Sequence, residues 1–171
     1  MKSNQNQNLA LSIMKKYAKI AQEEFQDEVL ALAVFGSVAR GEARFPGSDI
    51  DVLIVMRDIE NLSLGRRISL LTKLEKKLET TDEYKKFQEC FKWPPTIQEH
   101  ILSPGELKRH PPLLLDLTTD SIILYDKGIL TEELDKLRNT LRRLGAKRIR
   151  TNDTWFWILK PDLKLGEELE L

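Results

Sequence analysis

Two stretches of the chain, residues 29–35 and 49–55, are apolar over most of their length. Short apolar runs of this kind are typical of strands that are buried on both faces of a sheet. Gly36 and Ser37 follow the first run directly, and a loop at residues 42–48 precedes the second. Because glycine lets the backbone turn without a Cβ in the way, we predict a strand, a tight turn into a short helix, a loop and a second strand.

Helical periodicity accounts for most of the other apolar positions. Apolar side chains recur every three or four residues along residues 9–21, 64–78 and 130–144, which predicts three long amphipathic helices. Gly145 is expected to end the third of them. Aromatic residues at helical spacing within residues 80–91 allow either a short helix or an ordered loop there.

Three more segments favour extended structure, and two favour short helices. Residues 96–102, 121–125 and 155–159 are short and rich in β-branched or aromatic residues, which predicts strands, the second of them at a sheet edge. Residues 103–109 begin with a serine followed by proline, as helices often do, and residues 113–117 are strongly apolar. The fold class we predict is α/β (α+β), with a mixed β-sheet and flanking helices.

Length, charge and cysteine content narrow the functional classes. A chain of 171 residues can build one domain with a proper core. Its 27 basic and 27 acidic residues balance, which argues against a protein that coats nucleic acid by bulk charge. The single cysteine, Cys90, excludes an intramolecular disulfide and a cysteine zinc site, and we expect it to be at least half-buried. No apolar run reaches the ~18 residues of a membrane span, so we expect a cytoplasmic protein without a membrane partner.

The C-terminal part differs in composition from the rest. We expect a main domain at residues 1–128, and a basic helix with an aromatic tail at residues 129–171 packed on the same domain. The basic side chains of this part allow two interpretations, a solvated surface or a contact with substrate or nucleic acid. Aromatic burial explains Trp155 and Trp157 better than base stacking does.

Two aspartates interrupt the second apolar stretch. Side chains alternate along a strand, so Asp49 and Asp51 are predicted to project from one face with Cα atoms roughly 6.5 Å apart. Two adjacent carboxylates are costly to bury unless a cation neutralises them, and Mg²⁺ prefers oxygen ligands. The preceding turn, Gly36 and Ser37, offers backbone N–H groups and a hydroxyl at a helix start, where phosphates bind well.

These residues resemble a known family motif. Gly36-Ser37, Ala39-Arg40-Gly41 and Ser48-Asp49-Ile50-Asp51 resemble the GS…RG…SDxD motif of the DNA polymerase beta nucleotidyltransferase superfamily, above all its small prokaryotic members. The resemblance implies the polymerase beta-like nucleotidyltransferase fold. It also implies metal-dependent transfer of a nucleoside monophosphate from an NTP, expected to be ATP, to an acceptor hydroxyl, with release of pyrophosphate.

The resemblance also implies roles for individual side chains. Asp49 and Asp51 would hold two Mg²⁺ ions, for which Mn²⁺ is expected to substitute. The family has a third carboxylate on a neighbouring strand, more often an aspartate, and Glu99 is the candidate here; Asp116 and Glu106 are next.

The nucleotide would be bound by the turn and the loop that follows it. Gly36 and Ser37 would bind the β and γ phosphates, Arg40 would act as a phosphate clamp, and Ser48 belongs to the same nucleotide-binding motif.

The acceptor stays open between protein, RNA and a small molecule. An alternative function is a regulatory or antitoxin-like protein that binds a partner protein, with the leucine- and arginine-rich helix 130–144 as its docking surface and its catalytic activity secondary or lost. The intact aspartate pair and Gly-Ser turn favour the enzyme.

Overall fold

A computed structural model describes residues 2–152, 154–164 and 166–169 of the chain. Its elements in chain order are α1 (Lys2–Phe25), η1 (Gln26–Glu28), β1 (Val29–Phe35), α2 (Gly36–Ala39), β2 (Ile50–Met56), α3 (Leu64–Glu79), α4 (Asp82–Phe91), β3 (Ile97–Leu102), α5 (Pro104–Leu107), α6 (Leu113–Leu117), β4 (Ser121–Asp126), α7 (Ile129–Leu144), β5 (Lys147–Thr151) and β6 (Thr154–Ile158). The predicted helices and strands are confirmed, and the segment at residues 80–91 contains a helix, α4. The sequence did not predict β5.

The central sheet has four strands in the order β3-β2-β1-β4. β1 is antiparallel to both β2 and β4, whereas β2 and β3 are parallel, so the sheet is mixed as predicted. β4 lies at one edge, which confirms its expected position. β1 and β2 lie side by side in the middle and are buried along nearly their whole length, which explains their uniformly apolar sequences.

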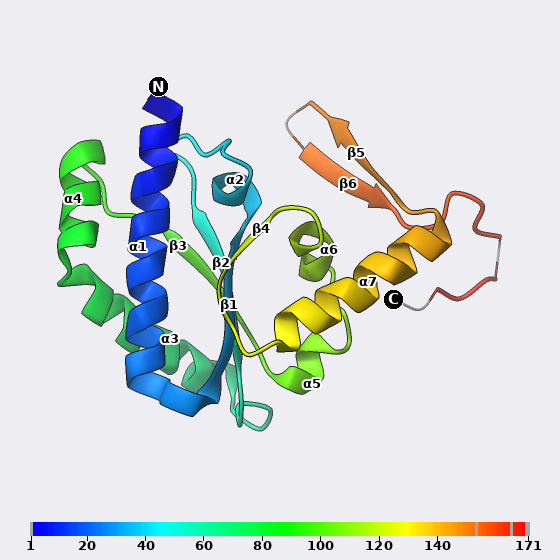
Figure 1. Cartoon of the computed structure of the whole chain (residues 1–171), viewed down its shortest axis with the longest axis horizontal. Coiled ribbons are helices and arrows are strands. Elements are labelled where there is room, and N and C mark those ends of the chain that lie inside the picture. The colour runs from blue at the N-terminus through cyan, green and yellow to red at the C-terminus, as the bar shows by residue number, and fades with distance from the viewer. Residues whose placement is uncertain (1, 153, 165, 170–171) are drawn as a thin grey trace.

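Helices cover both faces of this sheet and give the molecule three layers (Figure 1). On one face α1, α3 and α4 pack on alternate strand residues such as Val52 and Ile54. On the other face α5, α6 and α7 pack on the intervening residues, such as Leu53 and Val55. The two faces therefore enclose two separate hydrophobic clusters, and each strand residue belongs to one or the other according to its place in the alternation.

Local sequence signals fix the ends of several helices. The hydroxyl of Ser63 accepts a hydrogen bond from the backbone N–H of Arg66 at the start of α3. Ser103 and Glu106 form a complete capping box at α5. Gly145 ends α7 at φ +68°, a left-handed conformation that glycine adopts without a steric penalty, which confirms the predicted stop.

The leucines of α7 face the sheet. Leu130, Leu134, Leu137 and Leu141 are all buried in the second hydrophobic cluster. These leucines form part of the core and are not available to a partner protein, whereas the hypothesis that the helix docks a partner through its arginine-bearing side stays a prediction. The outer face of α7 is polar and carries the exposed Arg142 and Arg143.

Beyond α7 the chain forms a two-stranded antiparallel hairpin of β5 and β6, in which Arg148 pairs with Trp157 and Arg150 with Trp155. Trp157 packs against the second hydrophobic cluster, and Figure 1 shows the hairpin beside α6 at the end of α7. We therefore keep the proposal that residues 129–171 are an addition packed on the same domain.

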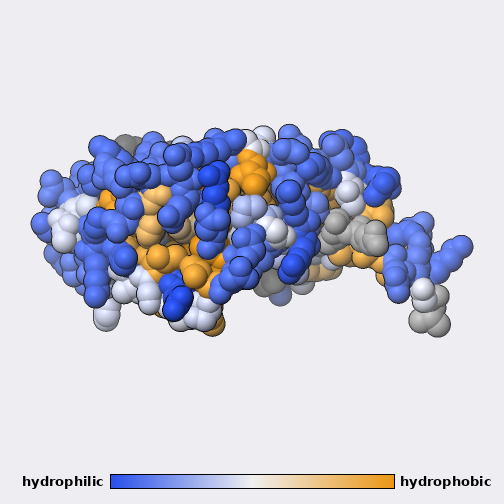
Figure 2. All heavy atoms as spheres, turned by 90° about the horizontal axis from the view of Figure 1, so that it is seen from below, coloured by the Kyte–Doolittle hydropathy of each residue, from blue (hydrophilic) through white to orange (hydrophobic). Residues whose placement is uncertain are grey.

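The surface seen in Figure 2 is mainly hydrophilic, with apolar side chains visible between the polar ones. Large exposed apolar residues include Leu64 at 72%, Trp93 at 64% and Ile68 at 51% exposure. Cys90 is exposed, so the expectation that it is at least half-buried is wrong. Among the described residues, no helix combines the length and apolar character that crossing a membrane requires.

Candidate active site

The carboxylate of Asp51 lies directly against the glycine turn. A Cβ placed on Gly36 would come within 2.2 Å of Asp51 Oδ2, and Gly36 itself has φ +68°. Both observations favour glycine at this position, one through its backbone conformation and the other through the space that Asp51 occupies. The turn and the second aspartate are thus one compact unit at the end of β1 and the start of β2.

Asp51 is half-buried, and burial disfavours the negative charge of its carboxylate. Burial raises the pKa of its carboxyl above the ordinary value, and the charges of Asp49 and Asp116 raise it further. His100 and Arg40 act in the opposite direction. Asp49 precedes β2 and is exposed, but it is close enough for its charge to act on Asp51. The expected proximity of the two aspartates therefore fits the electrostatics of the site.

Glu99 lies on the opposite face of the sheet. In the parallel pairing of β2 and β3, Glu99 is opposite Val52, while Asp51 is opposite Gln98. Val52 belongs to the cluster under α1, α3 and α4, so Glu99 points away from Asp51. The prediction that Glu99 completes the site as third carboxylate is wrong, because the register of two parallel strands decides the face and the sequence does not contain that register.

A tyrosine of α1 holds the Glu99 carboxylate instead. The buried hydroxyl of Tyr17 donates a hydrogen bond to Glu99 Oε1. Burial raises the pKa of Glu99 to about 7, although this hydrogen bond acts in the opposite direction, and the charge of Glu75 raises it further. Burial also raises the pKa of Tyr17 well above its usual value. Glu99 is therefore part of a polar contact between α1 and β3.

The other two carboxylates considered as third ligand have different surroundings. Glu106 caps α5 and accepts two hydrogen bonds from Arg67, so it is fully engaged. Asp116 is on the same side of the sheet as Asp51 and raises its pKa, but it contacts Arg148 and the indole N–H of Trp157, each at 3.4 Å. Within the described ranges, no three His, Cys, Asp or Glu side chains gather closely enough to hold a metal ion.

A pocket of about 740 Å³ opens beside the glycine turn. Ser37, Arg40 and Ser48 all line it, so the structure brings together three of the four residues predicted to bind the nucleotide, and Gly36 is adjacent in sequence. The lining also contains residues that were not predicted, namely Asn6, Gly41, Glu42, Ala43, Arg44, Phe45 and Arg150. Three arginines against one carboxylate make this pocket suited to an anion.

The loop that forms one wall of the pocket is anchored at several points. Phe45 packs edge-on against Phe87 of α4 with ring centroids 5.0 Å apart. The hydroxyl of Ser48 accepts a hydrogen bond from the backbone N–H of Arg44 at 2.7 Å, and the backbone N–H of Glu42 donates to the carbonyl of Ser37 at 2.9 Å. These contacts hold both serines and the neighbouring arginines in fixed positions around the pocket.

Sequence reasoning missed two features of this site. His100 faces Asp51 and contacts Phe35 with ring centroids 5.4 Å apart. Because His100 follows Glu99 directly in a strand, the sequence predicts that the two side chains lie on opposite faces of the sheet. It does not show which of them lies on the face of Asp51. Arg150 is one of many basic residues in the C-terminal part, and nothing in the sequence indicates that the hairpin returns to the pocket.

Known proteins are similar to this chain in domain family and in fold. The family model described as "Nucleotidyltransferase domain" matches residues 14–136. No curated protein is significantly similar in sequence. A structure from Sulfolobus solfataricus, described as a candidate nucleotidyltransferase, matches with a TM-score of 0.50 and 18% identity over 74% of this chain and 89% of that chain.

Two toxin–antitoxin structures are more distant matches. One is a toxin–antitoxin with AMP-PNP, with a TM-score of 0.46 and 12% identity over 77% of this chain and 92% of that chain. The other is a tri-AMPylated Shewanella oneidensis HEPN toxin in complex with MNT antitoxin, with a TM-score of 0.41 and 14% identity over 84% of this chain and 92% of that chain.

The matched family region contains the glycine turn, both aspartates and the whole four-stranded sheet. It covers most of the chain, and the Sulfolobus structure supports the same arrangement of sheet and helices. The chain belongs to the nucleotidyltransferase domain family and has the polymerase beta-like nucleotidyltransferase fold.

Proposed function

We propose that this protein transfers a nucleoside monophosphate from an NTP, ATP in the first instance, to an acceptor hydroxyl. The observation that carries the proposal is the contact between Asp51 and Gly36 beside an arginine-lined pocket. This contact supports the proposal, because a triphosphate bound in the pocket would have its reacting phosphate near the glycine turn and the Asp51 carboxylate. The acceptor is a protein, an RNA or a small molecule.

The aspartate pair fits a divalent cation. Burial and the neighbouring charge of Asp49 raise the pKa of Asp51, so a cation at this point would relieve an existing electrostatic cost. Asp49 and Asp51 would hold Mg²⁺, or Mn²⁺ in its place, and we assign no ligand role to Glu99. When bound, such a cation would neutralise phosphate charge and lower the pKa of the acceptor hydroxyl.

The other residues of the pocket bind and orient the nucleotide. The left-handed conformation of Gly36 turns the backbone into α2, and Ser37, which lines the pocket, offers a hydroxyl and an N–H group. Arg40 is held by Glu42 and by Asp120 of the segment before β4, which would position its guanidinium as a phosphate ligand. Holding both reactants in this way converts an encounter in solution into a reaction between positioned groups.

The proposal can be tested with labelled ATP. The full chain is incubated with Mg²⁺ or Mn²⁺, cell extract and ATP labelled either at the α or at the γ phosphate. Nucleotidyl transfer predicts that label from the α position becomes attached to an acceptor and that label from the γ position leaves with pyrophosphate. Nuclease and protease treatment of the labelled product then identifies RNA, protein or small molecule as the acceptor.

The matched control is Asp49→Asn, which keeps the size of the side chain and removes its charge. Because Asp49 is exposed, this variant should fold normally. It should bind ATP with Mg²⁺ less tightly and transfer no α label. Equal transfer by the parent and by Asp49→Asn, or label transfer from the γ position alone, would show that the proposed reaction is wrong.

A further inference from the structure

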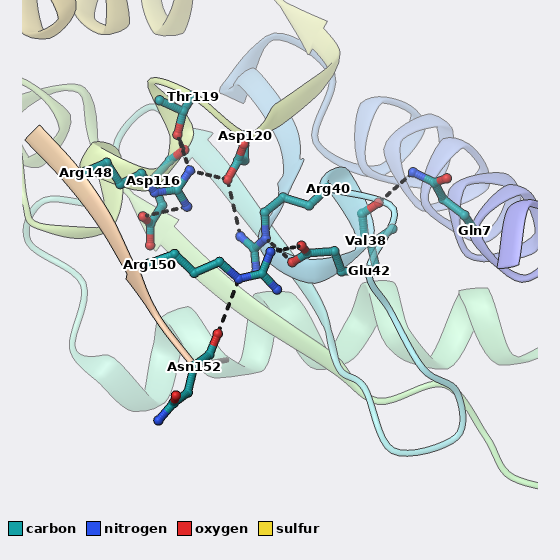
Figure 3. Close-up of polar contacts among 10 residues, drawn as sticks. All are labelled: Gln7, Val38, Arg40, Glu42, Asp116, Thr119, Asp120, Arg148, Arg150 and Asn152. Carbon is teal, nitrogen blue, oxygen red and sulfur yellow. Dashed lines mark hydrogen bonds and ion pairs between the residues drawn. The ribbon is translucent and has the colours of Figure 1, made fainter. Parts of the chain in front are cut away.

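A chain of alternating charges connects the C-terminal hairpin to the pocket. Arg148 of β5 pairs with Asp120, which also pairs with Arg40. Arg40 pairs with Glu42, and Glu42 pairs in turn with Arg150 of β5. Figure 3 shows these side chains converging from the hairpin, the segment before β4 and the loop after α2. The hairpin is therefore docked at the site through two arginines on the same face of one strand.

The two hairpin arginines have different surroundings. The side chain of Arg148 is only 11% exposed, and it contacts Thr119, Asp116 and Asp120. This buried guanidinium holds the hairpin in place through its ion pairs, although its Nε and one terminal nitrogen have no hydrogen-bond partner among the described residues, and leaving the carboxylates unpaired would be costly. The side chain of Arg150 is 49% exposed and lines the pocket. An exposed ion pair of this kind contributes little to stability, so Arg150 can exchange partners at low cost.

The Glu42 carboxylate is itself an anion bound between the guanidinium groups of Arg40 and Arg150. Glu42 Oε2 accepts from Arg40 Nε at 2.9 Å, and Glu42 Oε1 lies 3.2 Å from a terminal nitrogen of Arg150. Two arginines that share one carboxylate through its separate oxygens present the donor arrangement that a phosphate group requires. The guanidinium of Arg150 also lies over the Trp155 ring, 5.3 Å from its centroid, and its Nε donates to the carbonyl of Asn152.

We propose that Arg150 is a ligand of the terminal phosphates of the bound nucleotide, and that Glu42 holds Arg40 and Arg150 in position until a phosphate replaces it. The proposal rests on the proposed function, because it extends the same pocket. It assigns a substrate-binding role to the C-terminal hairpin, which lies outside the part of the chain that the family model matches. The hairpin thus completes the pocket that the glycine turn begins.

The test measures binding of inorganic tripolyphosphate to the full chain by isothermal titration calorimetry. Arg150→Gln should bind at least about 10-fold more weakly than the parent, the loss expected for a pair of charge-assisted hydrogen bonds. The matched control is Lys147→Gln, which removes one positive charge from the same strand at an exposed position that does not line the pocket. It should bind within about twofold of the parent, because a remote charge acts only through screened electrostatics.

Glu42→Gln tests the exchange itself. Removing the carboxylate that competes with phosphate should tighten tripolyphosphate binding by roughly 3-fold or more. Arg150→Lys keeps the charge but not the planar fork, and should bind between the parent and Arg150→Gln. Thermal melting of each variant near the parent midpoint would show that the hairpin stays docked through Arg148.

The outcomes separate this inference from the proposed function. If the parent transfers α label and Arg150→Gln binds tripolyphosphate as tightly as Lys147→Gln, the role of Arg150 is wrong and the transferase proposal stands. Unchanged or weaker binding by Glu42→Gln overturns the exchange of Glu42 for phosphate. If the parent binds neither tripolyphosphate nor ATP with Mg²⁺, the pocket is not a phosphate site and both proposals fail.

Discussion

Asp51 and Glu99 lie at nearly the same level on opposite faces of the sheet, and the surroundings of their carboxylates differ. Asp51 of β2 and Glu99 of β3 are separated by a single position in the register of the two parallel strands. Asp51 lies against the backbone of Gly36 beside an open pocket. Glu99 lies under α1 and accepts a hydrogen bond from Tyr17. A carboxylate within an apolar strand can thus be a ligand candidate or an internal polar contact.

Burial raises the pKa of both carboxyl groups, but different neighbouring groups surround the two carboxylates. The charges of Asp49 and Asp116 raise the pKa of Asp51, while those of His100 and Arg40 lower it. Glu99 has a hydroxyl donor within hydrogen-bond distance. The comparison teaches that a raised carboxyl pKa does not by itself indicate function, because it occurs both beside the glycine turn and in an internal contact between α1 and β3.

The largest effect is expected from Asp51→Asn. The amide keeps the shape of the side chain but removes the charge that would hold Mg²⁺, so nucleotidyl transfer should fall by about three orders of magnitude. The free energy of unfolding should stay the same or rise by up to about 1 kcal/mol, because a costly buried charge is removed. Label transfer and urea unfolding measure the two quantities.

Glu99→Gln is the matched variant on the other face. It should keep transfer within about twofold of the parent, because Glu99 does not reach the pocket. A loss of transfer comparable to that of Asp51→Asn would reverse the comparison and return Glu99 to the reaction.

Gly36→Ala should have the second largest effect. The new Cβ would meet Asp51 Oδ2, and alanine is strained at φ +68°, so we expect a loss of about 1–2 kcal/mol in the free energy of unfolding. Displacing Asp51 should also lower transfer by roughly 100-fold. Chemical denaturation and label transfer provide the measurements.

The control for this substitution is Gly65→Ala in α3, where nothing lies within 4 Å of the added Cβ. It should stabilise the protein by about 0.5–1 kcal/mol, since alanine is the better helix former, and leave transfer unchanged. If Gly36→Ala behaves like Gly65→Ala, the contact between the turn and Asp51 is not needed.

The smallest effect concerns the pH dependence of stability. The pKa of Glu99 is about 7 in the folded protein, against the ordinary value of 4.5, so the folded state binds the proton more tightly than the unfolded state does. The resulting stabilisation is complete below pH 4.5 and is lost as the pH rises through 7. Between about pH 5 and pH 8 the parent should lose about 1–2 kcal/mol more than Glu99→Gln, after allowance for partial solvent screening.

Urea unfolding of both proteins at the two pH values measures this difference. The glutamine side chain in the Glu99→Gln variant has no titrating group but can still accept the hydrogen bond from Tyr17, so packing is preserved. Equal losses for the parent and for Glu99→Gln would mean that the pKa of Glu99 is not raised in the folded protein.

The sequence by itself predicted the strands of the central sheet and the glycine turn, and it indicated the residues of the candidate site. Seven apolar residues before a glycine predict a buried strand and a turn, and the structure has β1 and Gly36 in those places. Alternation and charge repulsion then indicated the aspartate pair. These inferences depend only on neighbours within a few residues, for which local backbone geometry is sufficient.

The tertiary structure alone decided three things. The register of β2 against β3 placed Glu99 on the far face and His100 on the near one, and a shift of one residue would have exchanged them. The packing of α7 on the sheet decided that its leucines lie in the core and that Arg142 and Arg143 are exposed. The return of the β5–β6 hairpin brought Arg150 to the pocket. Each depends on contacts between residues far apart in the chain, and these follow from the packing of the whole domain rather than from any local pattern.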